Sequence, residues 1–407
     1  MDKNGFSWLV LEPFVHAVVR DNNVLLYNTL GKNHLLYRQE AEITQIVRQL
    51  IIPENGYVAK LTTVELENPR VVRFIADLRK KFMGDLFDPQ WSDSRPFNIV
   101  PLPILKGGIL PVEQQLVEVT FQVNTSDLPD LKTYKEASRQ FTFPVFADSP
   151  CQEMPVDMIR SVAAQMETLP FATVNFCGTG ILDDPRFGGY RRIFGKTSFR
   201  RKYHVNLRHL IIPLTFIPGK NEHLALYFTF PPDQQQLDLL QLAVQSYAKH
   251  PGVEFNFIVQ ESREVDYASE LISGLGIKHA GFKPYLNGEN IRFFEDQVFM
   301  SESDIYGSKP GRNEVFSRIS MNQNDYGKLT IFPNGDVYAN VNDPLLGNLA
   351  SHTVAELAGR EHETGISWKR RRMDVEPCSH CLYQFLCPPV SSYEIMTRRF
   401  NFCHILR

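Results

Sequence analysis

Three features of the sequence predict an α/β protein with distinct N-terminal, central and C-terminal parts. Three short strand patterns precede helix patterns near the N-terminus, strands and helices alternate through the middle, and four of the six cysteines lie near the C-terminus. A chain of 407 residues, 43% of them hydrophobic, is long enough to form more than one core. We expect an N-terminal domain over residues 1–90, a linker over 91–111, a central region over 112–325 and a C-terminal region over 326–407.

The N-terminal domain is expected to be a winged-helix-like three-stranded module. Apolar residues alternate over 15–19, and two further strands are predicted over 24–28 and 34–38, each set off by turn residues. Apolar residues at helical spacing then predict a helix near 43–50 and a second helix beginning at Pro69.

The central region is expected to form a mainly parallel sheet with crossover helices, closed or partly closed as a barrel. Strand patterns alternate there with helix patterns at 155–169 and 232–249, as in βαβ units. The predicted strands cover residues 117–123, 141–146, 172–176, 224–230, 253–259 and 279–285. A hairpin with its turn at 333–336 is predicted to open the C-terminal region.

Composition excludes several classes of function. The net charge of -3 provides no global attraction to nucleic acid or to an anionic membrane. No run of about 18 apolar residues is present, and the N-terminus lacks the basic and apolar regions of a signal peptide. We therefore expect a cytoplasmic protein with no nucleic-acid or membrane partner. Six cysteines are too few for a disulfide scaffold.

The strongest chemical signal is a set of four cysteines, Cys378, Cys381, Cys387 and Cys403. The first two are separated by two residues, a spacing that lets both sulfurs face one metal, and four soft thiolates suit an iron-sulfur cluster or tetrahedral zinc. The alternative is that they are buried, reduced thiols without a ligand. The spacing alone does not decide between iron-sulfur and zinc.

Residues 331–338, residues 346–349 and the C-x2-C-x5-C-P run resemble the SPASM domain that ends many radical SAM enzymes of peptide modification. That family has seven cysteines and typically two auxiliary clusters. At three of the seven positions this chain has Asn340, His352 and Ser391, which correspond mainly to the first auxiliary cluster. The four cysteines match the ligands of the second, so the resemblance implies a SPASM-like tail with one 4Fe-4S cluster, zinc being the alternative.

The central region resembles a partial (β/α) barrel of radical SAM type that has lost its catalytic cluster. Such enzymes carry C-x3-C-x2-C after the first barrel strand, whereas residues 124–147 contain no cysteine. We therefore expect no S-adenosylmethionine chemistry. Cys177 begins a Gly-x-Gly segment that we interpret as a tight turn after a strand rather than as a cofactor pocket. The chain as a whole resembles the pseudo-radical-SAM proteins of Bacteroidales peptide (GG-type) maturation systems.

The N-terminal domain resembles, by pattern, the PqqD-like element that captures leader peptides. Such an element binds by strand addition, so a leader would pair with the edge at 34–38 and lie against the helix that begins at Pro69. The expected peptide-binding residues are His34, Leu35, Leu36, Tyr37, Arg38, Arg70, Arg73 and Lys80. The alternatives are a solvated helix face and a winged-helix reader of DNA, and the latter is disfavoured by the net charge.

The main functional hypothesis is a non-catalytic protein that binds a ribosomally made precursor peptide and presents it to an active radical SAM enzyme. One alternative is an enzyme of unknown reaction that uses the remaining cluster, and another is a zinc-stabilised interaction module. No catalytic residues are predicted, because none of the histidines, among them His204, has a Ser-His-Asp or paired-carboxylate setting. Asp183 and Asp184 are interpreted as turn residues.

Overall fold

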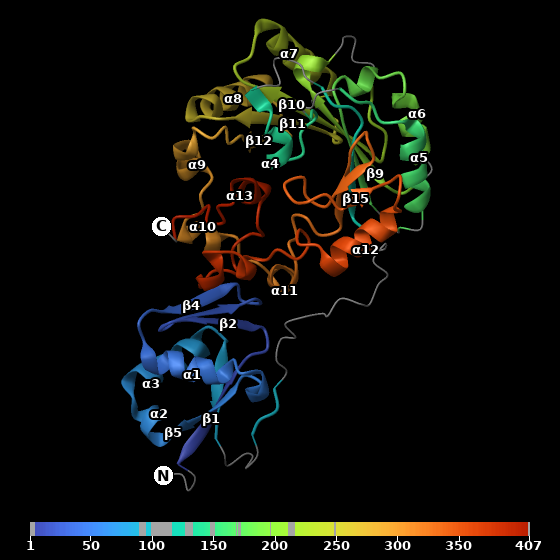
Figure 1. Ribbon diagram of the computed structural model, residues 1–407. Coiled ribbons are helices and arrows are strands. Elements are labelled where there is room, and N and C mark those ends of the chain that lie inside the picture. Colours follow the sequence, from blue (N-terminus) through green and yellow to red (C-terminus); the bar gives the residue numbers. More distant parts are fainter. Residues whose placement is uncertain are drawn as a thin grey trace.

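The structure is a computed structural model, and it describes residues 5–88, 95–98, 116–126, 133–146, 151–167, 169, 172–195, 197–210, 216–247 and 250–405. Most of the predicted linker therefore lies outside the described residues. The described part is a mixed α/β protein in which a smaller N-terminal domain packs against the end of a larger body (Figure 1). No helix in the described ranges is long and apolar enough to cross a membrane.

The N-terminal domain contains the predicted sheet and a second one. The first joins β2 (Val15–Arg20), β3 (Asn23–Asn28) and β4 (Asn33–Tyr37) in that order, with both pairs antiparallel. The second is formed by β5 (Val58–Thr62), β1 (Phe6–Leu11) and β6 (Gly84–Phe87). It was not predicted, because its strands are short and come together only through pairings distant in sequence. The domain's helices are α1 (Ala41–Leu50), α2 (Thr63–Glu67) and α3 (Pro69–Lys80), with a 3-10 turn at Pro53–Asn55.

Helices α1 and α3 hold this domain together by burying one apolar face each. Ile43, Ile46 and Val47 of α1 and Phe74 and Leu78 of α3 share one core with the strands. Asn68 caps α3 by accepting a hydrogen bond from the Arg70 backbone N–H, and Pro69 occupies the first turn, where its missing N–H costs nothing. Both predicted helices are confirmed.

The central sheet is parallel from β12 to β13 and antiparallel at its C-terminal edge. In the described residues its order is β12-β11-β10-β9-β8-β7-β13-β14-β15, with no pairing between the two ends, so the sheet stays open as a partial barrel. The strands are β7 (Glu118–Gln122), β8 (Thr173–Cys177), β9 (Arg200–Asn206), β10 (Glu222–Thr229), β11 (Val253–Val259), β12 (Ala280–Pro284), β13 (Lys328–Ile331), β14 (Asp336–Tyr338) and β15 (Gly347–Asn348). The β13–β14 hairpin confirms the turn predicted at 333–336.

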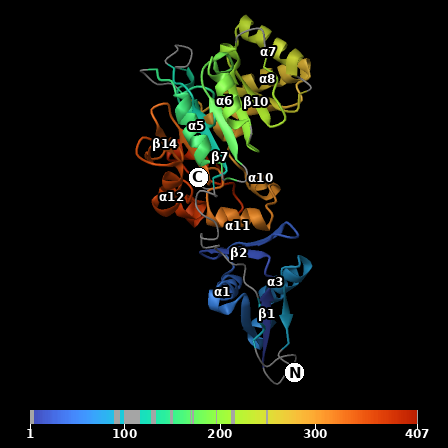
Figure 2. The same ribbon diagram turned by 90° about the vertical axis from the view of Figure 1, so that its right-hand side faces the viewer.

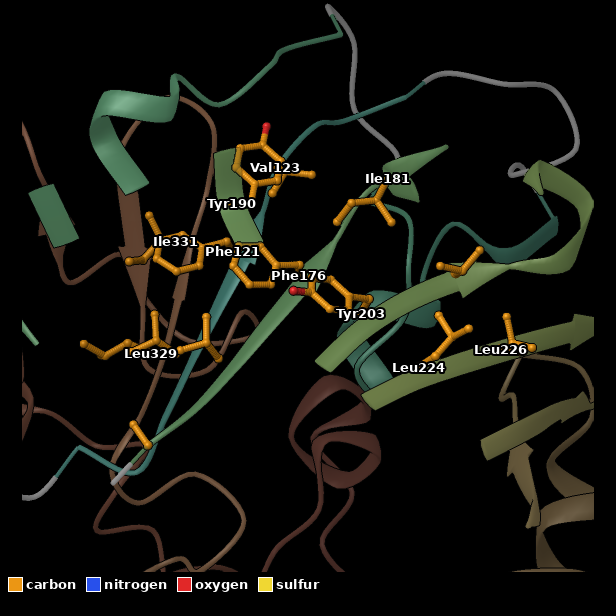
Figure 3. Packing of buried hydrophobic residues seen from close by; sticks show 14 of the residues in the cluster. Phe121, Val123, Phe176, Ile181, Tyr190, Tyr203, Leu224, Leu226, Leu329 and Ile331 are labelled. Carbon is orange, nitrogen blue, oxygen red and sulfur yellow. The ribbon is translucent and has the colours of Figure 1, made fainter. Parts of the chain in front are cut away.

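Helices cover the outer face of this sheet (Figures 1 and 2). That face is apolar, and Phe121, Phe176 and Tyr203 stack across neighbouring strands with ring centroids 5.6 and 5.4 Å apart (Figure 3). The crossover and flanking helices are α5 (Val156–Gln165), α6 (Phe187–Phe194), α7 (Gln234–Tyr247), α8 (Ser262–Leu275) and α9 (Ile291–Gln297). The opposite face of the same strands carries polar residues such as Thr120, Asn175 and His204.

In the central region one predicted strand is wrong and one observed strand was missed, each for an identifiable reason. The strand predicted at 141–146 is wrong: this segment is irregular after the short helix α4 (Ala137–Gln140). Its alternating Phe143 and Val145 pack with Tyr227 and Tyr285 in a small cluster instead of forming a ladder, and Pro144 has no N–H to donate to one. Strand β9 was missed because its first half is charged and only its second half is buried.

Both the end of the central region and the C-terminal region contact the N-terminal domain. The central region ends with α10 (Glu302–Gly307) and α11 (Arg312–Ser320). The C-terminal region contains α12 (Val354–Thr364), 3-10 turns at Arg372–Asp374 and Cys378–His380, and α13 (Ser392–Thr397). Figure 1 shows α10 and α11 lying next to β2 and β4 of the N-terminal domain. An apolar cluster joins the two parts, with Leu25 and Tyr27 of β3 on one side and Ile305, Val315 and Leu386 on the other.

Candidate metal centre and peptide-binding edge

The structure brings the four tail cysteines to one small cavity. Cys378 lies in a 3-10 turn with Cys381 directly after it, Cys387 follows a further turn, and Cys403 is placed by an isolated bridge with Met300. All four line a cavity of about 20 Å³, which has room for about one water molecule. Chain segments 25 residues apart thus contribute to one cavity.

The four sulfurs line the cavity but do not form a closed ligand shell. The Cys378 thiol donates to the Phe400 carbonyl oxygen at 2.9 Å, and Cys381 Sγ accepts from the Tyr383 backbone N–H at 3.4 Å. In the described part of the chain, no three His, Cys, Asp or Glu residues are close enough to hold a metal ion. Burial raises the pKa of the Cys378 thiol, that of Cys381 to about 11 and that of Cys387 to about 12. A raised pKa favours the protonated thiol, and each thiol would lose its proton on binding a metal.

The cavity is also lined by polar groups that suit a bound metal or cluster. Arg372 and Glu394 form a buried ion pair at 2.5 Å, and Arg372 Nη1 lies 3.7 Å from Cys378 Sγ. Gln384 is 1% exposed, and neither polar atom of its amide has a hydrogen-bond partner in the described residues. An amide left unpaired in a buried wall costs free energy unless something in the cavity bonds to it. The thiols and this amide are donor types that suit a metal centre, but they would have to move closer together to hold an ion.

The predicted ligand set limits the roles that a bound metal group could have. Cys378, Cys381, Cys387 and Cys403 would hold the group, and Arg372 would offset part of the negative charge of its thiolates. A bound cluster would supply electron transfer or structural cross-linking, and a zinc ion would supply cross-linking. Arg372, Glu394 and Gln384 were not predicted from the sequence, because no local pattern marks a residue whose partner is contributed by a distant turn.

The three positions that differ from the SPASM pattern have hydrogen-bond partners within the chain. Asn340 Nδ2 donates to Asp325 Oδ1 at 2.9 Å, and Ser391 Oγ accepts from the Glu394 backbone N–H as the N-cap of α13. His352 lies between Ser351 Oγ and Arg360 Nη2, at 2.9 and 2.8 Å. These side chains are used for hydrogen bonding within the chain.

The predicted peptide-binding strand is an edge strand. β4 ends its sheet, and the His34 carbonyl oxygen points away from β3, where it accepts a hydrogen bond from Lys81 Nζ at 2.6 Å. Alternate residues of an antiparallel strand turn their backbone groups to the same side, so the N–H and C=O of Leu36 also face outward. The side chains of Leu35 and Tyr37 lie in the domain core, and that of Leu36 packs on the interdomain cluster.

The outer side of β4 is flanked by two helices. Along α3, the Tyr37 hydroxyl donates to Asp77 at 2.7 Å, and Arg73 pairs with Glu40 at 2.6 Å. From α10, Tyr306 stacks on His34 with a centroid distance of 3.5 Å, and Glu302 pairs with Arg38 at 3.2 Å.

The remaining predicted basic residues lie further along α3. Arg70 pairs with Glu42 at 3.0 Å, and Lys80 is exposed. All three predicted arginines, Arg38, Arg70 and Arg73, therefore already have acidic partners in the structure. Because these pairs are exposed, each contributes about 1 kcal/mol or less and can be exchanged for a partner on a ligand.

The loop of the cysteine cavity also contacts the N-terminal domain and the residues beside β4. The Tyr383 hydroxyl donates to Glu302 at 2.7 Å and lies 3.3 Å from Arg38, while its backbone N–H donates to Cys381. Arg20 of β2 donates to the Ser379 carbonyl oxygen at 3.1 Å, between the first two cysteines. The loop that carries Cys378 and Cys381 therefore also forms part of the docking surface of the N-terminal domain.

The barrel residues singled out in the sequence have structural settings. His204 is buried, which lowers its pKa well below the ordinary value, and its ring nitrogens contact Tyr227 and Asn175 at 2.9 and 3.2 Å. Cys177 is fully buried. Gly178 makes a close turn, since a Cβ there would lie 2.5 Å from Val123, and Gly180 has a φ of +62°. The turn interpretation of this segment is confirmed.

Comparisons with known proteins give distant structural neighbours. No known protein family matches the sequence, and no curated protein matches it. Three crystal structures of Streptococcus suis SuiB match over 93% of this chain and 94% of theirs. SuiB bound to S-adenosylmethionine has 8% identity and a TM-score of 0.38, SuiB bound to the precursor peptide SuiA has 9% and 0.37, and a third SuiB structure has 8% and 0.35. Values this low do not define a shared family.

Proposed function

We propose that this protein binds a ribosomally made precursor peptide along the outer edge of β4 and presents it to a radical SAM enzyme without performing chemistry itself. The observation that carries this proposal is the outward-facing backbone of β4 between α3 and α10. An unpaired edge offers hydrogen bonds in register to an extended peptide, and the flanking helices supply contacts for its side chains. Arg73 and Lys80 offer positive charge to acidic leader residues.

Titration of the full-length protein with its cognate precursor peptide tests this assignment. Leu36→Pro removes an outward-facing N–H and should lower affinity by about tenfold, the loss expected for one hydrogen bond plus local distortion of the edge. Arg73→Glu should weaken binding less and reduce its salt dependence. Arg79→Glu is the matched control, because Arg79 pairs with Asp85 beyond the proposed contact.

The opposite result would overturn the assignment. If the peptide shifts only resonances of the central sheet or of the cysteine tail, and Leu36→Pro binds like the native protein, the peptide does not use β4. Unfolding midpoints of each variant separate lost binding from lost folding.

We propose further that the tail binds one metal centre per chain, a 4Fe-4S cluster. The four converging cysteines and the unpaired Gln384 amide support a bound group, and the resemblance to the second auxiliary site supports the cluster. Zinc is the second candidate, because a cavity of about 20 Å³ admits a single ion with less rearrangement than a cluster requires. Iron, sulfide and zinc analysis of anaerobically purified protein decides between them, and four free thiols in that protein would contradict both.

The proposed lack of catalysis has its own test. Residues 124–147 contain no cysteine, so the chain offers no three-cysteine loop for an iron with an open coordination position. The purified protein, given a reductant and S-adenosylmethionine, should form no 5'-deoxyadenosine. Turnover above a no-protein control would favour the enzyme alternative.

A further inference from the structure

The polar face of the central sheet bounds a second, larger cavity. It encloses about 430 Å³ between strands β7, β12 and β13, the segment that contains α4, and the start of α13. This volume lies within the range of small-molecule and peptide side-chain pockets. Asn340 and Ser391, two of the positions that differ from the SPASM pattern, belong to its wall.

Three polar groups in this wall lack partners within the described residues. Gln122 is 4% exposed and its Oε1 accepts no hydrogen bond, and the buried Ser138 Oγ has none either. The Lys283 ammonium makes no hydrogen bond or ion pair in the described part of the chain. Its nearest acid, Glu254, is already bonded to Lys202 at 2.7 Å and to Asn256 at 3.1 Å. Burial lowers the pKa of Lys283, the cost of holding its charge without a close counter-ion.

Among the described residues, two of the three cations around the cavity are paired with acids. Lys328 and Glu118 face each other at 3.8 Å, and Arg139 pairs with Glu136 at 3.3 Å. The remaining acid, Asp325, accepts hydrogen bonds from two asparagine amides, and burial raises its pKa to about 7. Lys283 is thus the cation in the wall that forms no ion pair within the described residues, because Glu254, the acid that acts on it, is bonded to Lys202.

We infer that this cavity binds a carboxylate-bearing ligand, with Lys283 as the charge partner of the carboxylate and Gln122 Oε1 as the acceptor for a ligand N–H. A single unpaired ammonium matches a single negative charge. A phosphate dianion would require more cations or an open helix N-terminus, but Ser391 already caps the start of α13.

The carboxylate has two chemical sources. One is an acidic residue of a bound peptide, a reading that rests on the proposed peptide-binding function, and the other is a free small carboxylate. A peptide also supplies an amide N–H for Gln122, whereas a free dicarboxylate supplies none, and this difference makes the two sources separable.

The experiment uses three defined probes and full-length protein with 13C-labelled lysine. The probes are the blocked pentapeptide acetyl-Gly-Gly-Glu-Gly-Gly-amide, its Gln counterpart and glutarate, and the observable is the ε-carbon resonance of Lys283. The Glu peptide should shift this resonance saturably and bind about tenfold more tightly than the Gln peptide, as expected for one charge-assisted hydrogen bond. Lys283→Met should abolish that difference. Lys278→Met, which alters an exposed lysine just before β12, should preserve it.

The outcomes are distinct. Three results would each overturn the site. They are equal affinity of the two bound peptides, no saturable binding of any probe, and a preference for the Glu peptide that survives Lys283→Met. Gln122→Leu should weaken binding of the Glu peptide and leave binding of glutarate unchanged. If only glutarate binds, and its binding requires Lys283, the ligand is a small carboxylate. Lys283→Met should not alter binding of the precursor at β4, so failure of this site and failure of the proposed function at Leu36 and Arg73 are read separately.

Discussion

The four tail cysteines and the three positions that differ from the SPASM pattern have different partners for their side chains. Asn340, His352 and Ser391 each bond to neighbours in the chain, at an acid, a hydroxyl and a helix N-terminus. The four cysteines face a shared cavity, and the Gln384 amide beside them has no hydrogen-bond partner in the described residues. Amides and hydroxyls form good hydrogen bonds within a protein, whereas thiols are weak donors and acceptors.

We call Asn340, His352 and Ser391 the substituted half, because they differ from the SPASM pattern, and the four cysteines the cysteine half. The substituted half already has hydrogen-bond partners, so its stability should be indifferent to metal. The cysteine half does not form a closed ligand shell, so under the proposed function its stability should depend on a bound metal.

The largest expected effect is therefore loss of the metal. Metal-ligand binding at a four-cysteine site contributes on the order of 10 kcal/mol to folding of the region around it. Chelation or Cys381→Ala should abolish hydrogen-exchange protection at 378–403. It should also lower protection in α10 and α11, because Cys381 shares a cluster with Ile305 and Val315. Cys151→Ala, at an exposed cysteine, is the control. Equal protection in apo and metal-loaded protein would show that the site is not structural.

A second effect comes from the ion pair behind the cysteines. Arg372 and Glu394 are both largely buried, so Arg372→Met leaves a buried carboxylate without its cation and should cost about 3–5 kcal/mol of unfolding free energy. Arg371→Met removes the neighbouring, more exposed pair with Asp374 and should cost about 1 kcal/mol or less. Urea unfolding of both variants measures the difference, and similar losses for the two would refute a special role for Arg372.

A pH effect distinguishes the polar cavity from the cysteine cavity. Burial raises the pKa of Asp325 from 3.8 to about 7, so between these values the folded protein binds more protons than the unfolded chain. Stability should therefore fall as pH rises through this window, by on the order of 2–4 kcal/mol. Asp325→Asn should remove that decline when urea unfolding is compared at pH 4.5 and 7.5. An unchanged slope in the variant would assign the effect to other groups.

The sequence predicts secondary structure well where residues close together in the chain determine it. The hairpin turn at 333–336, the start of α3 at Pro69 and the buried parallel strands are confirmed, because turn residues, caps and apolar runs act within a few positions. The metal site and the peptide edge stay predictions: the four cysteines line one cavity, and β4 is an edge strand. Strand β9 and the unpaired groups of Gln384 and Lys283 were missed, because their settings are created by distant segments.

The smallest expected effect tests the substituted half directly. Asn340 Nδ2 donates to Asp325 at 2.9 Å, and its Oδ1 accepts from the Asn342 backbone N–H at 2.9 Å. Asn340→Ala removes these bonds, together with weaker contacts to Ser392 and the Asn342 side chain, and should cost about 1–3 kcal/mol, the range for buried hydrogen-bonding groups left without a partner. Metal content should stay at the native value, because the four cysteines are untouched. Ser391→Ala is a poor comparison, since it also removes the cap of α13 beside Arg372. Loss of metal in Asn340→Ala would mean that the two halves are still one site, and the contrast between them would fail.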